Sequence, residues 1–137
     1  MSVLYRIASI LLLLFAAGHT LGFRKIDPKW GVDSLVASMR TIHFDAQGSS
    51  RSYWDFYTGF GLFVTVFLLF AAFLAWQLGG LSAQTLAGMR RITWAFALCF
   101  VAVTVLSWAY FFIAPVVFSG VVTLCLVAAA WRSAKPV

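Results

Sequence analysis

Glutamate does not occur in this chain, and the acidic residues are limited to four aspartates: Asp27, Asp33, Asp45 and Asp55. The two histidines, His19 and His43, fall in the same stretch, so every acid and every histidine lies between positions 19 and 55. Apart from cysteine, no side chain elsewhere titrates near neutral pH. We therefore expect any acid–base chemistry of this protein to reside in that stretch.

Charged residues of either sign are scarce. They make up 10% of the chain, against about 25% in a typical soluble domain, while hydrophobic residues make up 63% and the mean hydropathy is +0.95. This composition excludes an ordinary soluble domain and predicts an integral membrane protein. No internal repeat or long linker divides the 137 residues, so we expect one transmembrane domain over 1–137.

Long hydrophobic runs define the predicted fold. A helix needs about 20 apolar residues to cross the bilayer with its backbone hydrogen bonds satisfied internally. Four segments meet this requirement: 3–23, 53–78, 92–112 and 115–131. Arg6 lies near the end of the first segment, where it can reach the headgroups, and no small-residue cleavage site follows Leu11–Leu14. The predicted fold class is all-α, an integral membrane four-helix bundle that retains its first helix.

The boundaries of these helices follow from glycine and proline. Gly79 and Gly80 are expected to end the second helix, and 92–131 is too long for a single crossing. Pro115 fits the first turn of a new helix, where its missing N–H is least costly. The third and fourth helices are therefore predicted to be adjacent and antiparallel, joined by a tight hairpin near 112–115.

Four crossings place both termini on one side of the membrane. That side carries five basic residues and no acid: Arg6, Arg90, Arg91, Arg132 and Lys135. The 24–52 loop also carries five, but among three acids: Arg24, Lys25, Lys29, Arg40 and Arg51. The acid-free side is predicted to be cytoplasmic, in a bacterial inner membrane. The net charge of +6 then indicates anchoring against anionic lipid, with no nucleic acid as partner.

The 24–52 loop is too long for a simple connection. We predict that Asp33 caps a short amphipathic helix, in which apolar residues and a histidine recur every three to four positions: Leu35, Val36, Met39, Ile42 and His43. The residues 46–50 then form a turn that leads into the second span. We expect this loop to act as a lid over the mouth of the bundle.

Depth in the membrane suggests which polar residues share a pocket. His19 lies about 6 Å before the end of the first span, at 1.5 Å per residue, and Asp55 lies a similar distance into the second. We therefore expect His19 and Asp55, the candidate catalytic residues, at the same depth. The predicted ligand contacts are Thr58, Trp108 and Tyr110 in the wall and His43, Phe44 and Asp45 in the lid. Ionisable residues inside a membrane are functional hypotheses by default.

Other roles for the two candidate catalytic residues stay open. Asp55 can cap the second span, and His19 can make an interhelical hydrogen bond beside Gly18 and Gly22, which have the spacing of a GxxxG packing face. Alternatively, Asp55 orients His19 as a general base. The sequence does not decide whether the protein is an enzyme.

A metal or haem would use His19 and His43 as nitrogen ligands, with Asp45 or Asp55 as an oxygen ligand or second partner. No HExxH or CxxC motif supports this, and the cofactor is left unknown. Cys99 and Cys125 fall at comparable depth, where packing is favoured over a redox pair.

The second span also carries a regular face. Tyr57, Gly61 and Thr65 recur every four residues, and Gly59 lies two residues before Gly61. This spacing indicates close helix packing or a smooth wall for a ligand. Aromatic residues, 18% of the chain, would suit a flat apolar ligand as well as the membrane boundary.

The GHTLG sequence at 18–22 and the SYWDFY sequence at 52–57, with the two glycines that follow, resemble an uncharacterised family of small bacterial four-span membrane proteins. The topology is also similar to that of the EXPERA group of sterol isomerases and lipid-ligand receptors, and to DoxX-like proteins. The first resemblance implies no activity. The membrane glutamates of an EXPERA-type isomerase have no counterpart in this chain.

The sequence thus favours a membrane protein that binds, and by a further hypothesis transforms, a small hydrophobic or amphipathic molecule. The competing hypothesis is a non-catalytic subunit that forms a homo-oligomer or joins a larger membrane complex. Two small-residue faces would serve such association, Gly18 with Gly22 and Ser119 with Thr123.

Overall fold

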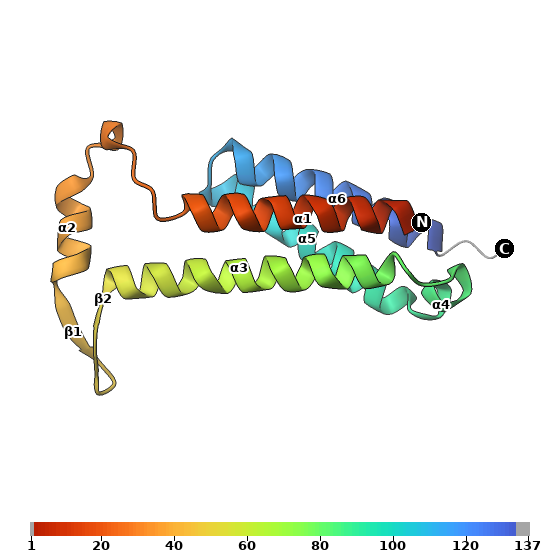
Figure 1. Ribbon diagram of the computed structural model, residues 1–137, viewed down its shortest axis with the longest axis horizontal. Coiled ribbons are helices and arrows are strands. Elements are labelled where there is room, and N and C mark those ends of the chain that lie inside the picture. Colours follow the sequence, from red (N-terminus) through yellow and green to blue (C-terminus); the bar gives the residue numbers. More distant parts are fainter. Residues whose placement is uncertain (1, 134–137) are drawn as a thin grey trace. The chain divides into compact units, whose positions relative to one another are not determined.

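The computed structural model describes residues 2–133, and these residues form six α-helices, a short 3-10 helix and one β-hairpin (Figure 1). In chain order the elements are α1 Ser2–Gly22, η1 Pro28–Trp30, α2 Asp33–Thr41, β1 His43–Ala46, β2 Ser49–Ser52, α3 Tyr53–Leu78, α4 Ala83–Gly88, α5 Arg90–Tyr110 and α6 Ile113–Ser133. Four helices, α1, α3, α5 and α6, are long and apolar enough to cross a membrane. The predicted all-α membrane fold is confirmed.

The boundaries of the long helices agree with the glycine and proline signals. α3 ends at Leu78, directly before Gly79. The break between α5 and α6 falls at Phe111, whose backbone is extended, and Pro115 is the third residue of α6. The short helix α4 was not predicted from the sequence. It begins after Ser82, whose side chain accepts a hydrogen bond from the Thr85 backbone N–H as a helix cap does.

The described chain forms two compact units. Unit 1 comprises residues up to Phe15 and from Leu68 onward, and unit 2 comprises 16–67. Helices α1 and α3 each contribute one end to each unit.

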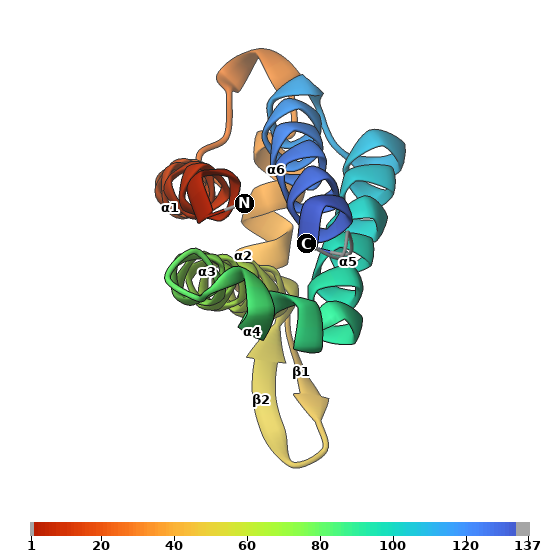
Figure 2. The same cartoon turned by 90° about the vertical axis from the view of Figure 1, so that its right-hand side faces the viewer.

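Unit 1 is a bundle of the first part of α1, the second part of α3, and α4, α5 and α6. Its largest fully buried side chains include Tyr5, Leu12, Phe100 and Leu126. Helices α5 and α6 lie side by side in Figures 1 and 2. Their threonines Thr104 and Thr123 share a hydrogen bond of 2.9 Å.

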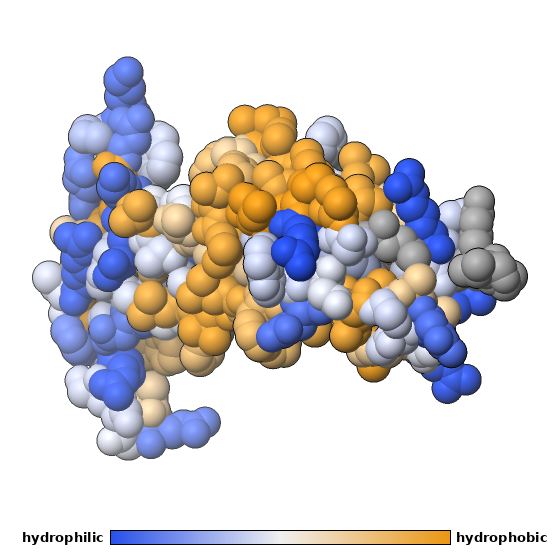
Figure 3. All heavy atoms as spheres, turned by 45° about the vertical axis from the view of Figure 1, so that its right-hand side comes forward, coloured by the Kyte–Doolittle hydropathy of each residue, from blue (hydrophilic) through white to orange (hydrophobic). Residues whose placement is uncertain are grey.

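Small and hydroxyl-bearing residues join the other helices of unit 1. The Ser9 hydroxyl of α1 donates to the Ala72 carbonyl of α3 over 2.7 Å. Hydrogen bonds of this kind commonly stabilise contacts between membrane helices, because lipid tails offer no alternative donor or acceptor. Many large apolar side chains point outward instead (Figure 3), as expected for helices solvated by lipid.

Unit 2 contains the end of α1, the connecting segment and the start of α3. Its helix α2 corrects two details of the prediction. Asp33 is the first residue of α2 and not its cap; Val32 occupies the cap position without a side-chain hydrogen bond. The helix ends at Thr41, because His43 is already extended and pairs with Ser52 in the hairpin. No residue of α2 is buried.

The hairpin was not predicted, although its turn was. Gln47 and Gly48 both have positive φ, 54° and 83°, which is the backbone of a two-residue type I′ turn. The Asp45 carboxylate accepts a hydrogen bond of 2.9 Å from the Gly48 N–H and braces this turn. Strand β2 is rich in serine, which is not among the residues that favour β-strands. The sequence therefore did not predict this strand.

Candidate ligand site in unit 2

The end of α1 and the start of α3 run antiparallel and are joined by side-chain hydrogen bonds. His19 meets the Gly61 carbonyl, Thr20 meets Thr65 over 2.9 Å, and the Tyr57 hydroxyl donates to the Phe23 carbonyl. His19 lies opposite Gly61, and Phe23, four residues later and directly after the end of α1, lies opposite Tyr57, four residues earlier in α3. These contacts fix the register of the two helices within unit 2.

This register corrects the predicted depth of the two candidate catalytic residues. His19 lies level with Gly61, whereas Asp55 is six residues nearer the start of α3. Six helical residues span about 9 Å. Among the described residues, no hydrogen bond joins His19 to Asp55. The prediction failed because it counted residues from the ends of the spans and had no information on how the helices are staggered.

Asp55 is a capping residue. Its Oδ2 accepts from the Ser52 N–H at 2.8 Å, while the Asp55 N–H donates to the Ser52 Oγ at 3.2 Å. This reciprocal pair is a capping box in which Ser52 precedes the helix and Asp55 is its third residue. The alternative role for Asp55, a cap of the second span, is therefore confirmed.

The capping box gives a first testable prediction. Ser52→Ala and Asp55→Ala should each lower the free energy of unfolding by about 1 kcal/mol, measured by denaturant titration in detergent. Because both substitutions remove the same reciprocal pair, the double variant should lose less than the sum of the two. Additive losses would show that the two hydrogen bonds act independently.

His19 has a defined hydrogen-bonding state. Its Nε2 lies 2.9 Å from the Gly61 carbonyl oxygen. A carbonyl only accepts, so Nε2 carries the hydrogen, and Nδ1 keeps a lone pair in the neutral ring. Within residues 2–133, Nδ1 has no hydrogen-bond partner. The half-buried ring also stacks on Phe23, with centroids 5.0 Å apart and planes 10° apart. His19 therefore offers one oriented acceptor atom.

Gly61 allows this arrangement because it has no side chain. A Cβ atom added at Gly61 would overlap the Phe23 ring. The same ring carries the His19 stack, faces Tyr57 at 5.9 Å and lies under the Arg24 guanidinium at 5.3 Å. Gly18 and Gly22 behave differently: both are exposed, and no atom would lie within 4 Å of an added Cβ. Their predicted packing face is therefore not used within the described chain.

Two threonines extend the polar contact along the same face. The Thr20 hydroxyl donates to the Ala16 carbonyl at 2.7 Å, and the Thr65 hydroxyl reaches both Thr20 at 2.9 Å and the Gly61 carbonyl at 3.3 Å. Each threonine has a single hydroxyl hydrogen, so these three contacts share two hydrogens. Thr65 and His19 both reach the Gly61 carbonyl. The four-residue spacing of Tyr57, Gly61 and Thr65 predicted this face of α3. No pattern in the sequence predicted the contacts of Thr20 and Phe23.

Thr58 is the exception on this face. It lies three residues before Gly61 and seven before Thr65, so all three occupy one side of α3. Its Oγ1 atom is buried and has no hydrogen-bond partner among the described residues. A buried hydroxyl without a partner costs about 1–3 kcal/mol. Thr58 was predicted to contact a ligand. Its buried hydroxyl is a second polar group of unit 2 without a partner in the described chain, in addition to Nδ1 of His19.

The predicted lid residues lie on β1 and serve the loop. His43 is exposed, with Nδ1 3.0 Å from the Thr41 carbonyl, and Asp45 braces the hairpin turn. Phe44 is half-buried and packs against Tyr53 and Phe56 at the start of α3, with ring centroids 5.1 and 5.9 Å apart. The aromatic contact holds the hairpin to α3.

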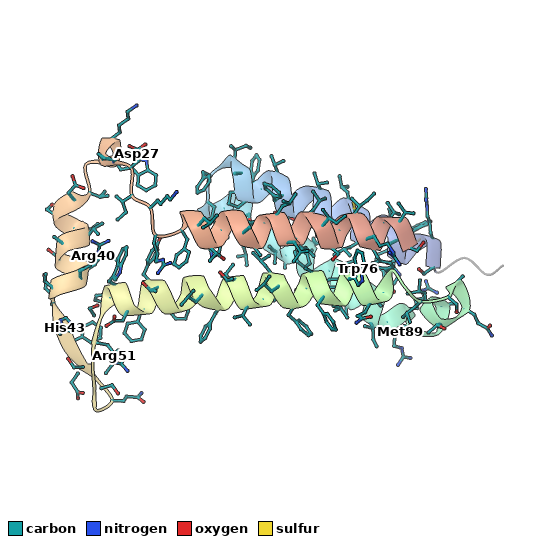
Figure 4. All side chains as sticks on the ribbon, viewed as in Figure 1. Asp27, Arg40, His43, Arg51, Trp76 and Met89 are labelled. Atoms are coloured by element: carbon teal, nitrogen blue, oxygen red, sulfur yellow. The ribbon has the colours of Figure 1, made fainter. Side chains whose placement is uncertain are left out.

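Helix α2 is attached to α3 by a second aromatic contact. The Arg40 guanidinium lies 4.2 Å from the centre of the Trp54 ring, a cation–π geometry. Figure 4 shows Arg40 on α2, with His43 and Arg51 at the hairpin. Trp54 also faces Tyr57 at 5.3 Å, so these aromatic contacts connect the loop to the ring cluster around His19.

The remaining predicted contacts, Trp108 and Tyr110, belong to unit 1. Both are largely exposed on α5, at 77% and 79% of their surface, whereas Ser107 is buried. Their contact with a ligand stays a prediction.

Metal ligation has little support in the side-chain arrangement. Among residues 2–133, no three His, Cys, Asp or Glu side chains come together as a metal site. His19 and His43 each use one ring nitrogen on a backbone carbonyl. Cys99 is exposed and Cys125 is half-buried, and both are free thiols. The polar groups at the end of α1 and the start of α3 are arranged for hydrogen bonding, and the metal prediction for His19 and His43 stays a prediction.

No protein-family model matches this chain, and comparison with curated proteins and with solved structures gives no significant match.

Proposed function

We propose that this membrane protein binds a small amphipathic molecule through its polar group at His19 and Thr58 in unit 2. The observation that carries the proposal is the pair of unsatisfied polar atoms, His19 Nδ1 and the buried Thr58 Oγ1, on apolar membrane-length helices. Membrane interiors offer no water to satisfy such groups. A bound molecule is the partner that would do so.

The chemistry of the two atoms defines the class of ligand. Nδ1 accepts a hydrogen bond, and a threonine hydroxyl both donates and accepts. A ligand hydroxyl suits either atom, because it can donate to Nδ1 and can donate to or accept from the threonine hydroxyl. Leu62, four residues after Thr58 and on the same side of α3, is exposed and would contact the hydrocarbon or ring portion. The proposed ligand is therefore a hydroxyl-bearing lipid or a similar flat amphiphile.

Asp55 has a supporting role in this proposal. Its carboxylate is engaged in the capping box, so it fixes the start of α3 and leaves ligand contact to other groups. We propose binding without a catalytic step. The proposed setting is a bacterial inner membrane with both termini in the cytoplasm, which the acid-free basic ends of α1, α5 and α6 support.

Native mass spectrometry of the protein in mild detergent tests the proposal. The wild-type protein should retain a discrete bound mass, and His19→Ala should retain at least tenfold less. His43→Ala is the matched control, since His43 is exposed and bonds only within its own loop, and it should retain the wild-type amount. A wild-type protein free of bound mass, or equal loss in both variants, would contradict the proposal.

A second function, that of a non-catalytic subunit, is favoured by one observation. Gly18 and Gly22 leave an open strip on α1, where another helix can approach closely. The other predicted face is not available, because Ser119 is buried and Thr123 bonds to Thr104 within unit 1. Gly18→Ile should convert an oligomer into a monomer in detergent if α1 forms the interface.

A further inference from the structure

Unit 1 carries unbalanced positive charge. Its described residues include four arginines, Arg6, Arg90, Arg91 and Arg132, and neither an acidic residue nor a lysine. No carboxylate within this part of the unit is present to pair with them. All four are exposed, and three of them, Arg90, Arg91 and Arg132, lie at the ends of membrane-length helices.

These arginines gather at one end of the unit. Arg6 lies in the second turn of α1, Arg90 and Arg91 begin α5, and Arg132 lies in the last turn of α6. Figure 1 shows the start of α1, the end of α3, α4 and the end of α6 at the same end of unit 1. The ends of membrane-spanning helices lie at the depth of lipid headgroups. The arginines are therefore positioned where lipid phosphates are found.

Arg6 is held in place by its neighbours. Its guanidinium lies 4.7 Å from the centre of the Trp76 ring, and its Cγ would be 3.0 Å from a Cβ added at Gly79. Trp76 and Met89, both labelled in Figure 4, mark this end of the unit. A guanidinium ordered on an aromatic face loses less freedom when it binds an anion, and its planar fork matches phosphate geometry.

The position of Arg90 and Arg91 also favours an anion. The start of a helix carries partial positive charge, so two cations there are disfavoured. The first turn of α5 contains no acid, and Met89 supplies no side-chain cap. A bound phosphate would relieve both the repulsion between the arginines and the unfavourable dipole interaction.

We propose that this arginine end of unit 1, formed by Arg6, Arg90, Arg91 and Arg132, binds the headgroup of an anionic phospholipid. The site is separate from the His19 group in unit 2 and does not depend on the proposed function. Its ligand is a lipid that bears a phosphate and a net negative charge. Zwitterionic lipid of the same chain length should be bound much less tightly.

The test uses the full-length protein in mixed micelles with equal amounts of phosphatidylglycerol and phosphatidylcholine, analysed by native mass spectrometry. The wild-type protein should retain phosphatidylglycerol in clear preference. Each arginine that contacts the bound headgroup contributes about a fivefold change in anionic lipid binding. Arg90→Gln/Arg91→Gln should therefore reduce the preference by at least fivefold.

The control is Arg24→Gln/Arg51→Gln, which removes the same charge from unit 2 and should leave the preference within about twofold of wild type. Circular dichroism verifies that both proteins fold. If the Arg90→Gln/Arg91→Gln protein lacks the helical order of wild type, Arg132→Gln replaces it and should reduce the preference by about fivefold. An unchanged preference in the folded α5 variant, or an equal loss in the control, overturns the proposal.

Discussion

Gly61→Ala is expected to lower the free energy of unfolding by about 1–3 kcal/mol, the usual effect of overfilling a packed contact. The added methyl group would overlap the Phe23 ring, so this ring, which stacks on His19, has to shift. The substitution should therefore disturb the His19 imidazole as well as reduce stability. Thermal unfolding in detergent, followed by circular dichroism, measures the first effect.

The control for this prediction is Gly59→Ala, in the same helix. A Cβ at Gly59 meets no atom within 4 Å, and alanine is a better helix former than glycine, so this variant should be as stable as wild type or slightly more so. In a Phe23→Ala background, Gly61→Ala should cost much less than in the wild-type protein. An equal cost in both backgrounds would show that the Phe23 ring is not the obstacle.

Thr58→Val is expected to make the ligand-free protein more stable by about 1 kcal/mol and to reduce ligand retention at least tenfold. Valine has nearly the same shape and removes a buried hydroxyl that has no partner, so the unmet desolvation cost disappears. If the hydroxyl contacts a ligand, the same change removes that contact. Stability and retention should therefore move in opposite directions, as they do at functional sites.

Thr65→Val provides the contrast. Its hydroxyl already bonds to Thr20 and to the Gly61 carbonyl, so its removal should lower stability by about 1 kcal/mol, in the range for hydrogen bonds between membrane helices. A Thr58→Val protein that is less stable and retains its ligand would remove Thr58 from the site. Unfolding in detergent and native mass spectrometry on the same samples supply both readings.

Hydropathy alone predicted the four long helices, because bilayer thickness fixes the length of apolar sequence that a helix needs. Local signals placed several boundaries, among them Gly79 after α3 and Pro115 in the first turn of α6. The Ser52-x-x-Asp55 spacing is a capping-box signature, and reading it as such would have assigned Asp55 its structural role. The hairpin was missed because only its turn, at Gln47–Gly48, has a distinctive composition.

The hydrogen bond and ring stack of His19 could not be predicted from the sequence, for a physical reason. Its partner is the backbone carbonyl of Gly61, and a carbonyl is present at every position, so no residue type marks it. The stagger of α1 against α3 depends on packing of Phe23 against Gly61, which a count of residues from the span ends does not contain. Thr58 was predicted from its depth in the membrane, but the hydrogen-bonding state of its hydroxyl required coordinates.

The central claim is that Gly61 holds His19 with hydrogen on Nε2 and leaves Nδ1 open as an acceptor. The chain has only two histidines, so His43→Gln, prepared without a histidine tag, leaves His19 as the sole imidazole for ¹⁵N NMR. The neutral ring should give two well-separated nitrogen resonances, with the one-bond proton coupling on Nε2, and Gly61→Ala should alter them. A proton on Nδ1, or rapid exchange between the two tautomers in the folded protein, would contradict the account.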